Sequence, residues 1–178
     1  KKTPELLSKI GQAIGDLNGQ YITGEDVGST VEDMLSLRKE TDHVMGAPLE
    51  KGGSGDPSSM TALGCFVGIK ASVKNRFNTD DLKGVRVAVQ GLGNVGWNLC
   101  TRLHSAGAIL FVCDISESIS KRCAEAFGAT VIDINNIYDA DVDVFSPCAM
   151  GVVINDKTIS RLKAKVIAGG ANNQLATE

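Results

Sequence analysis

The 178-residue sequence has few of the side chains that build metal centres or disulfide frameworks. It contains two histidines, His43 and His104, and five cysteines, none of which form a Cys-x-x-Cys pair. A zinc site and a set of paired disulfides are therefore both disfavoured. We expect no metal and reduced cysteines that act as small core residues, as in a cytoplasmic protein.

The sequence also lacks clustered positive charge and long apolar runs. The net charge is −3, the pI is about 5.4, and the 18 lysines and arginines are scattered. This pattern argues against a nucleic-acid surface. No run approaches the roughly 20 apolar residues of a membrane span, and the first ten residues lack the apolar core of a signal peptide. We therefore expect small-molecule partners, with no nucleic acid and no membrane.

The first part of the chain predicts helices separated by loops. Residues 3–18 fit a helix that Thr3 can cap, with Pro4 at its first position and Gly19 after its end. Its apolar residues recur at helical spacing, and we expect this stripe to belong to a core. A short strand at 20–23, a helix at 28–37, a Gly- and Pro-rich loop at 45–59 and a long helix at 57–75 should follow.

From residue 85 onward, apolar strands alternate with helices. The predicted strands are 85–90, 108–114, 130–133, 142–147 and 164–169, and the predicted helices are 94–106 and 116–127. Strands with few charges that alternate with helices indicate a parallel sheet covered on both faces. The fold class is therefore α/β, with a Rossmann-like, doubly wound parallel sheet.

A glycine-rich loop lies between the first of these strands and its helix. The segment "VRVAVQGLGNVG" ends in Gly-x-Gly-x-x-Gly, formed by Gly91, Gly93 and Gly96. In this context Gly91 allows a tight turn, Gly93 lets the backbone approach a pyrophosphate, and Gly96 lets the helix lie close to the strand. Backbone amides at the helix start would hold the phosphates. The remaining residues expected in this dinucleotide site are Leu92, Asn94 and Val95. The alternative is that the glycines only make a tight turn.

An acidic residue ends the next strand, 23 residues after Gly91. Asp114 can accept hydrogen bonds from both ribose hydroxyls of adenosine and would repel a 2′-phosphate, which favours NAD over NADP. Lys121 and Arg122 lie further along the predicted helix, and their positive charges keep NADP as the alternative cofactor. Alternatively, Asp114 only caps that helix.

Five segments together resemble one family. They are "NGQYITGEDVGSTVEDM", "GDPSSMTALG", "VAVQGLGNVG", "DVFSPCAMGVVIN" and "AKVIAGGANNQL". Their order and spacing are similar to those of the glutamate/leucine/phenylalanine/valine dehydrogenases, with the nearest likeness to the leucine and valine enzymes. The resemblance implies two domains around a cleft, here residues 1–50 from a substrate domain and 51–178 as the NAD domain. It also implies NAD-dependent oxidative deamination of an L-amino acid to a 2-oxo acid and ammonia, in branched-chain amino acid catabolism.

The resemblance assigns the catalytic acid to the "EDVG" segment. Asp26 matches the family's catalytic aspartate, which moves protons to and from the amine and water. Glu25 beside it is expected to be structural. From the residues alone, a cap for the helix that follows is the favoured interpretation of Asp26, and only the resemblance reverses this.

Further positions match the family's nicotinamide site. Thr61 corresponds to a threonine near the carboxamide, and Cys148 and Ala149 to residues beside the ribose. Asn172 and Asn173 follow the last strand, and one of them should contact nicotinamide or substrate. A helix-interior threonine, a buried cysteine in a turn and two loop asparagines are the plainer interpretations.

Two parts of the family pattern are absent from the sequence. The catalytic and carboxylate-binding lysines should lie upstream of residue 1, and the C-terminal helices beyond residue 178. We therefore expect the chain to be a fragment that binds NAD but has little activity alone, from a homo-oligomeric parent enzyme. A non-catalytic NAD(H)-binding regulatory module, and a family member acting on phenylalanine or glutamate, stay open as alternatives.

Overall fold

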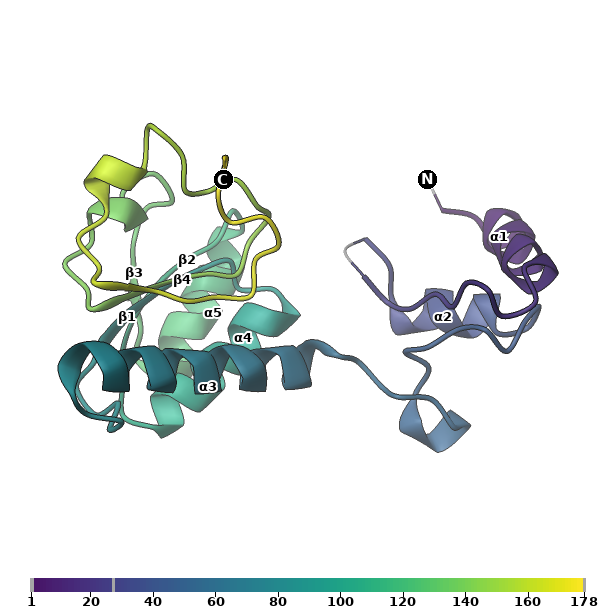
Figure 1. The fold of residues 1–178 in the computed structure, drawn as a ribbon, viewed down its shortest axis with the longest axis horizontal. Helices are drawn as coiled ribbons and strands as arrows, with labels where there is room; N and C mark the ends of the chain where they lie inside the picture. The colour runs from purple at the N-terminus through teal and green to yellow at the C-terminus, as the bar shows by residue number, and fades with distance from the viewer. Residues whose placement is uncertain (1, 27, 178) are drawn as a thin grey trace. The chain divides into compact units, whose positions relative to one another are not determined.

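The computed structural model describes residues 2–26 and 28–177, which divide into two compact units between Pro57 and Ser58. In chain order, the first unit contains the helices α1 (Pro4–Asp16) and α2 (Val31–Leu37) and the 3₁₀-helix η1 (Leu49–Lys51) (Figure 1). Among the described residues, no helix has the length and apolar character that crossing a membrane requires.

Helix α1 begins where the sequence predicts. The Thr3 side chain accepts a 3.2 Å hydrogen bond from the Leu6 N–H, Pro4 is the first helical residue, and Gly19 follows the end with a φ of +80°. The predicted apolar stripe is only partly core. Ile14 is buried, whereas Leu6, Ile10 and Leu17 are each more than 40% exposed.

Helix α2 begins three residues later than predicted. Thr30 is its N-cap and forms a capping box with Asp33, in which each side chain bonds the other residue's backbone N–H. Met34 and Leu37 of α2 form a small core with Val44. The short strand expected at 20–23 is reduced to a single parallel bridge between Thr23 and Val44.

The second unit carries the parallel sheet and its helices. In chain order its elements are α3 (Ser58–Phe77), β1 (Arg86–Gln90), α4 (Asn94–Ser105), β2 (Ile109–Cys113), α5 (Glu117–Phe127), β3 (Thr130–Val131), the 3₁₀-helix η2 (Ile137–Asp139), β4 (Val144–Pro147), the 3₁₀-helix η3 (Ile159–Arg161) and β5 (Val166–Ile167). Each predicted strand from residue 85 onward is present, although β3 and β5 have only two residues each.

The five strands form one sheet in the order β3-β2-β1-β4-β5, and every neighbouring pair is parallel. In this register Val89 of β1 lies beside Val112 of β2 and Ser146 of β4. The α/β class and the Rossmann-like parallel sheet predicted from the sequence are confirmed. Because the chain leaves β1 on one side toward β2 and later returns on the other side as β4, the sheet has a switch point between β1 and β4.

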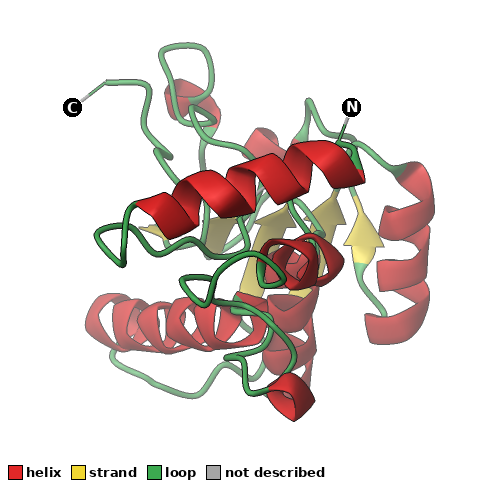
Figure 2. Cartoon of the chain, turned by 90° about the vertical axis from the view of Figure 1, so that its right-hand side faces the viewer, coloured by secondary structure: helices red, strands yellow, loops and turns green. Residues whose placement is uncertain are grey.

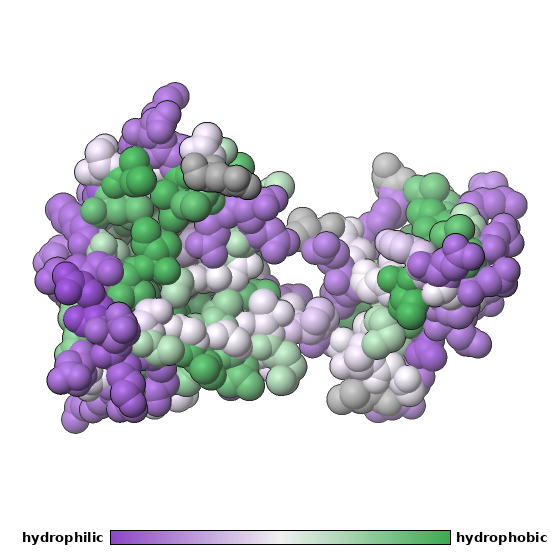
Figure 3. Space-filling model, viewed as in Figure 1, coloured by the Kyte–Doolittle hydropathy of each residue, from purple (hydrophilic) through white to green (hydrophobic). Residues whose placement is uncertain are grey.

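The two faces of the sheet are covered differently. Val87 and Val89 point into a core that includes residues of α3, α4 and α5. Ala88 and Phe145 point to the other face, where Ile137 of η2 and Ile154 complete a second core. In the described chain that second face is covered by 3₁₀ turns and loops, which Figure 2 colours red and green. Polar side chains cover much of the surface of each unit, and apolar ones reach it in between (Figure 3).

Candidate functional site

The glycine-rich loop turns sharply between β1 and α4. Gly91 has a φ of +91°, and its N–H donates a 2.8 Å hydrogen bond to the Cys113 carbonyl at the end of β2. A Cβ on Gly91 would lie 2.7 Å from the Ala149 backbone nitrogen. Only glycine therefore combines this left-handed backbone with such a close approach. The contact brings the predicted residues Gly91 and Ala149 together at the switch point.

The other two glycines have opposite surroundings. A Cβ on Gly96 would overlap the Gly91 carbonyl oxygen, so glycine is needed for α4 to lie against the loop. A Cβ on Gly93, in contrast, would meet no heavy atom within 4 Å. Gly93 is also the N-cap of α4 and provides no side-chain cap. The space beside Gly93 at the start of α4 is therefore open, and the first amides of α4 have no side-chain cap, so a phosphate group could bind there.

Asp114 holds the loop from the neighbouring strand. Its Oδ2 accepts a 2.7 Å hydrogen bond from the Leu92 N–H, and its Oδ1 accepts a 2.9 Å hydrogen bond from the Ser116 N–H. A carboxylate oxygen has two lone pairs, so each oxygen can accept a further bond from a hydroxyl. Asp114 is not the cap of α5, because Ser116 is the N-cap and receives no side-chain cap. The bond to Leu92 ties Asp114 to the glycine-rich loop instead.

Four elements meet around Gly170, which follows β5. A Cβ on Gly170 would lie 3.0 Å from Val95 Cγ1, 3.1 Å from Cys65 Sγ and 3.9 Å from Thr61 Cγ2. The Gly170 N–H also donates a hydrogen bond to the Cys148 sulfur. Three predicted residues, Thr61, Val95 and Cys148, are thus brought together.

Sequence reasoning missed Gly170 and Cys65. The Gly-Gly pair at the end of a predicted strand was the available signal, since Gly169 also approaches the Pro147 backbone too closely for a Cβ. Burial raises the pKa of both the Cys65 and the Cys148 thiols. Neutral thiols are poor nucleophiles, which agrees with a packing or contact role.

Asn172 and Asn173 lie in the exposed loop that follows β5. This loop is attached to the end of β4, because the Ala171 N–H donates a 2.9 Å hydrogen bond to the Pro147 carbonyl. Asn173 has a left-handed backbone, with a φ of +50°. Both asparagines therefore follow the carboxyl end of a strand, the edge at which open α/β sheets bind ligands.

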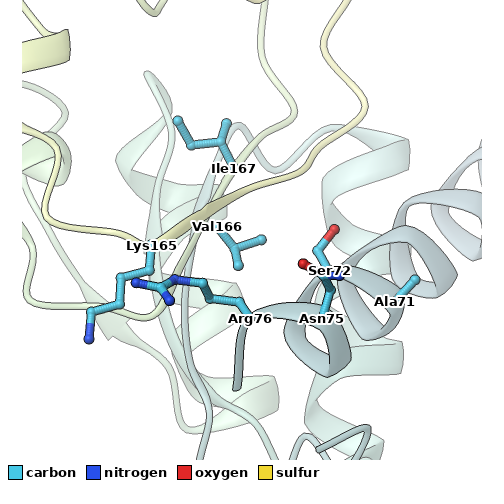
Figure 4. Close-up of a pocket in the computed structure, with 7 residues that line it drawn as sticks. All are labelled: Ala71, Ser72, Asn75, Arg76, Lys165, Val166 and Ile167. Atoms are coloured by element: carbon cyan, nitrogen blue, oxygen red, sulfur yellow. The ribbon is translucent and has the colours of Figure 1, made fainter. Parts of the chain in front are cut away.

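A groove of about 450 Å³ lies elsewhere on this unit. Arg76 of α3 and Lys165, just before β5, both border it (Figure 4). Its lining residues include none of the predicted site residues, and Lys165 precedes its strand instead of following it. The groove is therefore separate from the candidate dinucleotide site.

In the first unit, Asp26 lies in a tight turn with an exposed side chain. Its N–H donates a 2.8 Å hydrogen bond to Ser29 Oγ, and its carbonyl accepts bonds from both the N–H and the hydroxyl of Ser29. The capping alternative for Asp26 is wrong, because Thr30 caps α2. Val27, between Asp26 and Gly28, lies outside the described residues.

Two further side chains adjoin this turn. Lys2 Nζ donates a 2.6 Å hydrogen bond to the Gly28 carbonyl and pairs with Asp33 of the capping box. Glu25 Oε2 is buried and has no hydrogen-bond partner among the described residues. Burial, followed by the nearby charges of Asp56, Glu32 and Asp33, raises the Glu25 pKa.

Comparison with known proteins gives a consistent result. The model of the glutamate/leucine/phenylalanine/valine dehydrogenase family matches residues 52–122. The chain is 52% identical over 174 residues to the leucine dehydrogenase of Bacillus subtilis (strain 168), covering 98% of this chain and 48% of that protein. It is 48% identical over 177 residues to the L-tryptophan dehydrogenase of Nostoc punctiforme, covering 99% of this chain and 49% of that protein.

A solved structure shares the fold. The crystal structure of L-tryptophan dehydrogenase from Nostoc punctiforme matches with a TM-score of 0.77 at 44% identity, covering 100% of this chain and 50% of that chain. The chain spans about half the length of the curated relatives it matches.

Proposed function

The chain belongs to the glutamate/leucine/phenylalanine/valine dehydrogenase family, and from that premise we propose that the protein is an NAD-dependent amino acid dehydrogenase. Its reaction is the oxidative deamination of leucine, valine or isoleucine to the 2-oxo acid and ammonia. In this proposal residues 1–50 belong to the substrate domain and residues 51–178 bind NAD. We also propose that the intact protein assembles into a homo-oligomer.

The observation that carries the proposal is the geometry of the glycine-rich loop. Open space at Gly93, uncapped amides at the start of α4 and a carboxylate fixed at the end of β2 fit a pyrophosphate and the adjoining ribose. Leu92, Asn94 and Val95 would line the same cradle. The residues present therefore fit a dinucleotide.

The surroundings of Asp114 favour NAD over NADP. Its carboxylate would repel a 2′-phosphate. The two basic residues that left NADP open have other contacts, since Arg122 lies over the Trp97 ring at 4.4 Å and Lys121 pairs with Glu117 at 3.9 Å. Neither cation is therefore held ready for a phosphate beside Asp114.

In the proposal, the nicotinamide half of NAD binds on the β4 and β5 side of the switch point, and the adenosine half binds on the β2 side. Thr61, Cys148 and Ala149 would contact its ring or ribose, and Asn172 or Asn173 would orient its carboxamide or the substrate. When bound, NAD supplies the acceptor for the hydride that leaves the substrate α-carbon. The meeting of Thr61 and Cys148 at Gly170 supports a shared site for these residues.

Asp26 is the proposed acid and base. The chemistry needs a carboxylate that takes protons from the amine and from water, and that returns a proton to the leaving ammonia. Its negative charge would also stabilise the cationic iminium formed by loss of hydride. Support comes from the exposed side chain of Asp26 and from the Ser29 and Lys2 contacts that hold its turn.

The test is the appearance of NADH absorbance when the intact protein is mixed with NAD and single L-amino acids. We expect the largest rise with leucine, valine and isoleucine. A larger rise with phenylalanine or glutamate would keep the dehydrogenase and change its substrate. Binding of NADH without a rise for any amino acid would instead indicate a regulatory NAD(H)-binding module.

A further inference from the structure

Val152 has a backbone conformation that its side chain disfavours. Its φ is +65°, in the left-handed region, where a β-branched residue is an outlier. The other non-glycine residues with positive φ in the described chain, Asn18, Asn78 and Asn173, are of the type that tolerates this region. Val152 is also 55% exposed, so burial of its side chain does not explain the conformation.

Contacts with the loop after β5 account for this backbone. The Val152 N–H donates a 2.6 Å hydrogen bond to the Asn173 carbonyl. At Gly151, a Cβ would overlap the carbonyl oxygens of Asn172 and Asn173. The backbone of 151–152 therefore packs directly on the backbone of the two asparagines, at a separation that excludes any other side chain at position 151.

The same pairing continues beyond these residues. The Ile154 N–H donates a 3.0 Å hydrogen bond to the Gln174 carbonyl, and the Ala176 N–H donates a 2.9 Å bond to the Ile154 carbonyl. The loop after β4 thus runs alongside the loop after β5 and holds it by backbone contacts. Local strain of this kind persists where surrounding structure imposes it, and it concentrates at functional sites.

We propose that Gly151 and Val152 are positioning residues that set the backbone of Asn172 and Asn173 on the nicotinamide side of the dinucleotide site. The inference rests on the proposed function, because it takes NAD as the ligand. It adds that the asparagine side chains depend on the loop after β4 for their orientation. Neither Gly151 nor Val152 needs to touch the ligand.

The test compares two ligands in three variants of the intact protein. NADH carries the nicotinamide ring, whereas ADP-ribose has the adenosine, the pyrophosphate and both riboses but lacks that ring. Val152→Pro removes the N–H donor and imposes a φ near −65°. We expect the NADH Kd to rise about tenfold or more, which corresponds to the loss of one or two oriented hydrogen bonds. The ADP-ribose Kd should stay within about twofold.

Matched variants separate positioning from general damage. Asn78 also has a left-handed backbone, and its N–H donates a 2.9 Å bond to the Lys74 carbonyl at the end of α3. Asn78→Pro likewise removes an N–H donor and a left-handed backbone conformation, but away from the site. It should leave the Kd values for NADH and ADP-ribose unchanged. Val152→Gly keeps the N–H and the left-handed backbone, and it should bind NADH as the wild type does.

Two results would overturn the proposal. One is unchanged NADH affinity in Val152→Pro, and the other is an equal loss of affinity for NADH and ADP-ribose. The proposed activity is judged separately. Suppose that no amino acid is oxidised, but that Val152→Pro still lowers the affinity for NADH and not for ADP-ribose. The dehydrogenase assignment then fails while the positioning role stands.

Discussion

The Leu92 N–H and Asp114 Oδ2 are joined by a 2.7 Å hydrogen bond that ties the glycine-rich loop to the end of the neighbouring strand. This carboxylate therefore shapes the loop, and in the proposed function it also binds the adenosine ribose. Its two tasks are separable by experiment, because the loop needs an acceptor whereas discrimination against a 2′-phosphate needs a negative charge.

Asp114→Asn should keep an acceptor but lose the charge. We expect the affinity for NADH to fall modestly and the affinity for NADPH to rise, so that the preference between them shrinks by about tenfold. Fluorescence titration with both dinucleotides measures this. Asp133→Asn is the control, since Asp133 follows β3 and its side chain accepts a hydrogen bond only from the local Asn135 N–H among the described contacts. An unchanged NADH/NADPH ratio in Asp114→Asn would contradict the assignment.

The same substitution at two glycines should have opposite effects. Gly96→Ala places a Cβ on the Gly91 carbonyl, and we expect a loss of about 1–3 kcal/mol or more of unfolding free energy. Gly93→Ala meets no atom within 4 Å, so its Tm should barely change, whereas its Cβ would intrude on a bound pyrophosphate. Thermal melts and NADH titrations of both variants check this. Tight NADH binding by a stable Gly93→Ala protein would count against the phosphate site.

Asp26→Asn should remove turnover and leave cofactor binding intact. General acid–base groups typically contribute about 10²–10⁴-fold to rate, so kcat should fall at least about 100-fold in the intact protein. The NADH Kd and the Tm should stay close to wild type, because the Asp26 side chain is exposed. Asp42→Asn, an exposed acid in the same unit, is the control. Unchanged turnover in a folded Asp26→Asn protein would reject the catalytic role.

Lys2 should stabilise the Asp26 turn in a pH-dependent way. The hydrogen bond from Lys2 holds the Asp33 pKa below its usual range. A depressed carboxylate pKa adds stability above the unfolded-state value of about 3.9, and this stability is lost as the pH falls through the lower folded-state pKa. Lys2→Met should therefore lower the Tm at pH 7, and the difference from wild type should shrink progressively as the pH falls below about 4.

Lys9→Met provides the matched control for this prediction. Lys9 Nζ donates a hydrogen bond only to Gln12 of its own helix among the described contacts, and its charge is a minor cause of the lowered Glu40 pKa, so its removal should change the Tm less than removal of Lys2 does. Melts between pH 3 and pH 7 compare the three proteins. A Lys2→Met deficit that persisted undiminished at pH 3 would show that the ion pair is not its cause.

Much of the fold follows from short-range signals in the sequence. Thr3 and Pro4 mark the start of α1, and Gly-x-Gly-x-x-Gly after an apolar strand marks the turn into α4. Alternation of apolar strands with helices indicates the parallel sheet. These signals work because capping, φ > 0 and side-chain periodicity depend on residues within one turn or one strand.

The start of α2 shows where such signals compete. Ser29 and Thr30 are both suitable caps, and the sequence predicts a helix from residue 28. In the structure the Ser29 hydroxyl bonds the backbone of Asp26, which leaves Thr30 as the cap. Two hydroxyls with similar propensity are distinguished only by the partners that the folded chain brings to them.

By itself, the sequence determined the α/β class, the glycine loop, the acid that follows it, and the resemblance that points to Asp26 and the asparagines. Only the tertiary structure decided that Gly170 joins Thr61, Val95 and Cys148, and that Val152 adopts a left-handed backbone beneath Asn173. The physical reason is distance along the chain. These contacts join segments that follow different strands, and no local propensity records which carbonyl or sulfur another loop will place against a given residue.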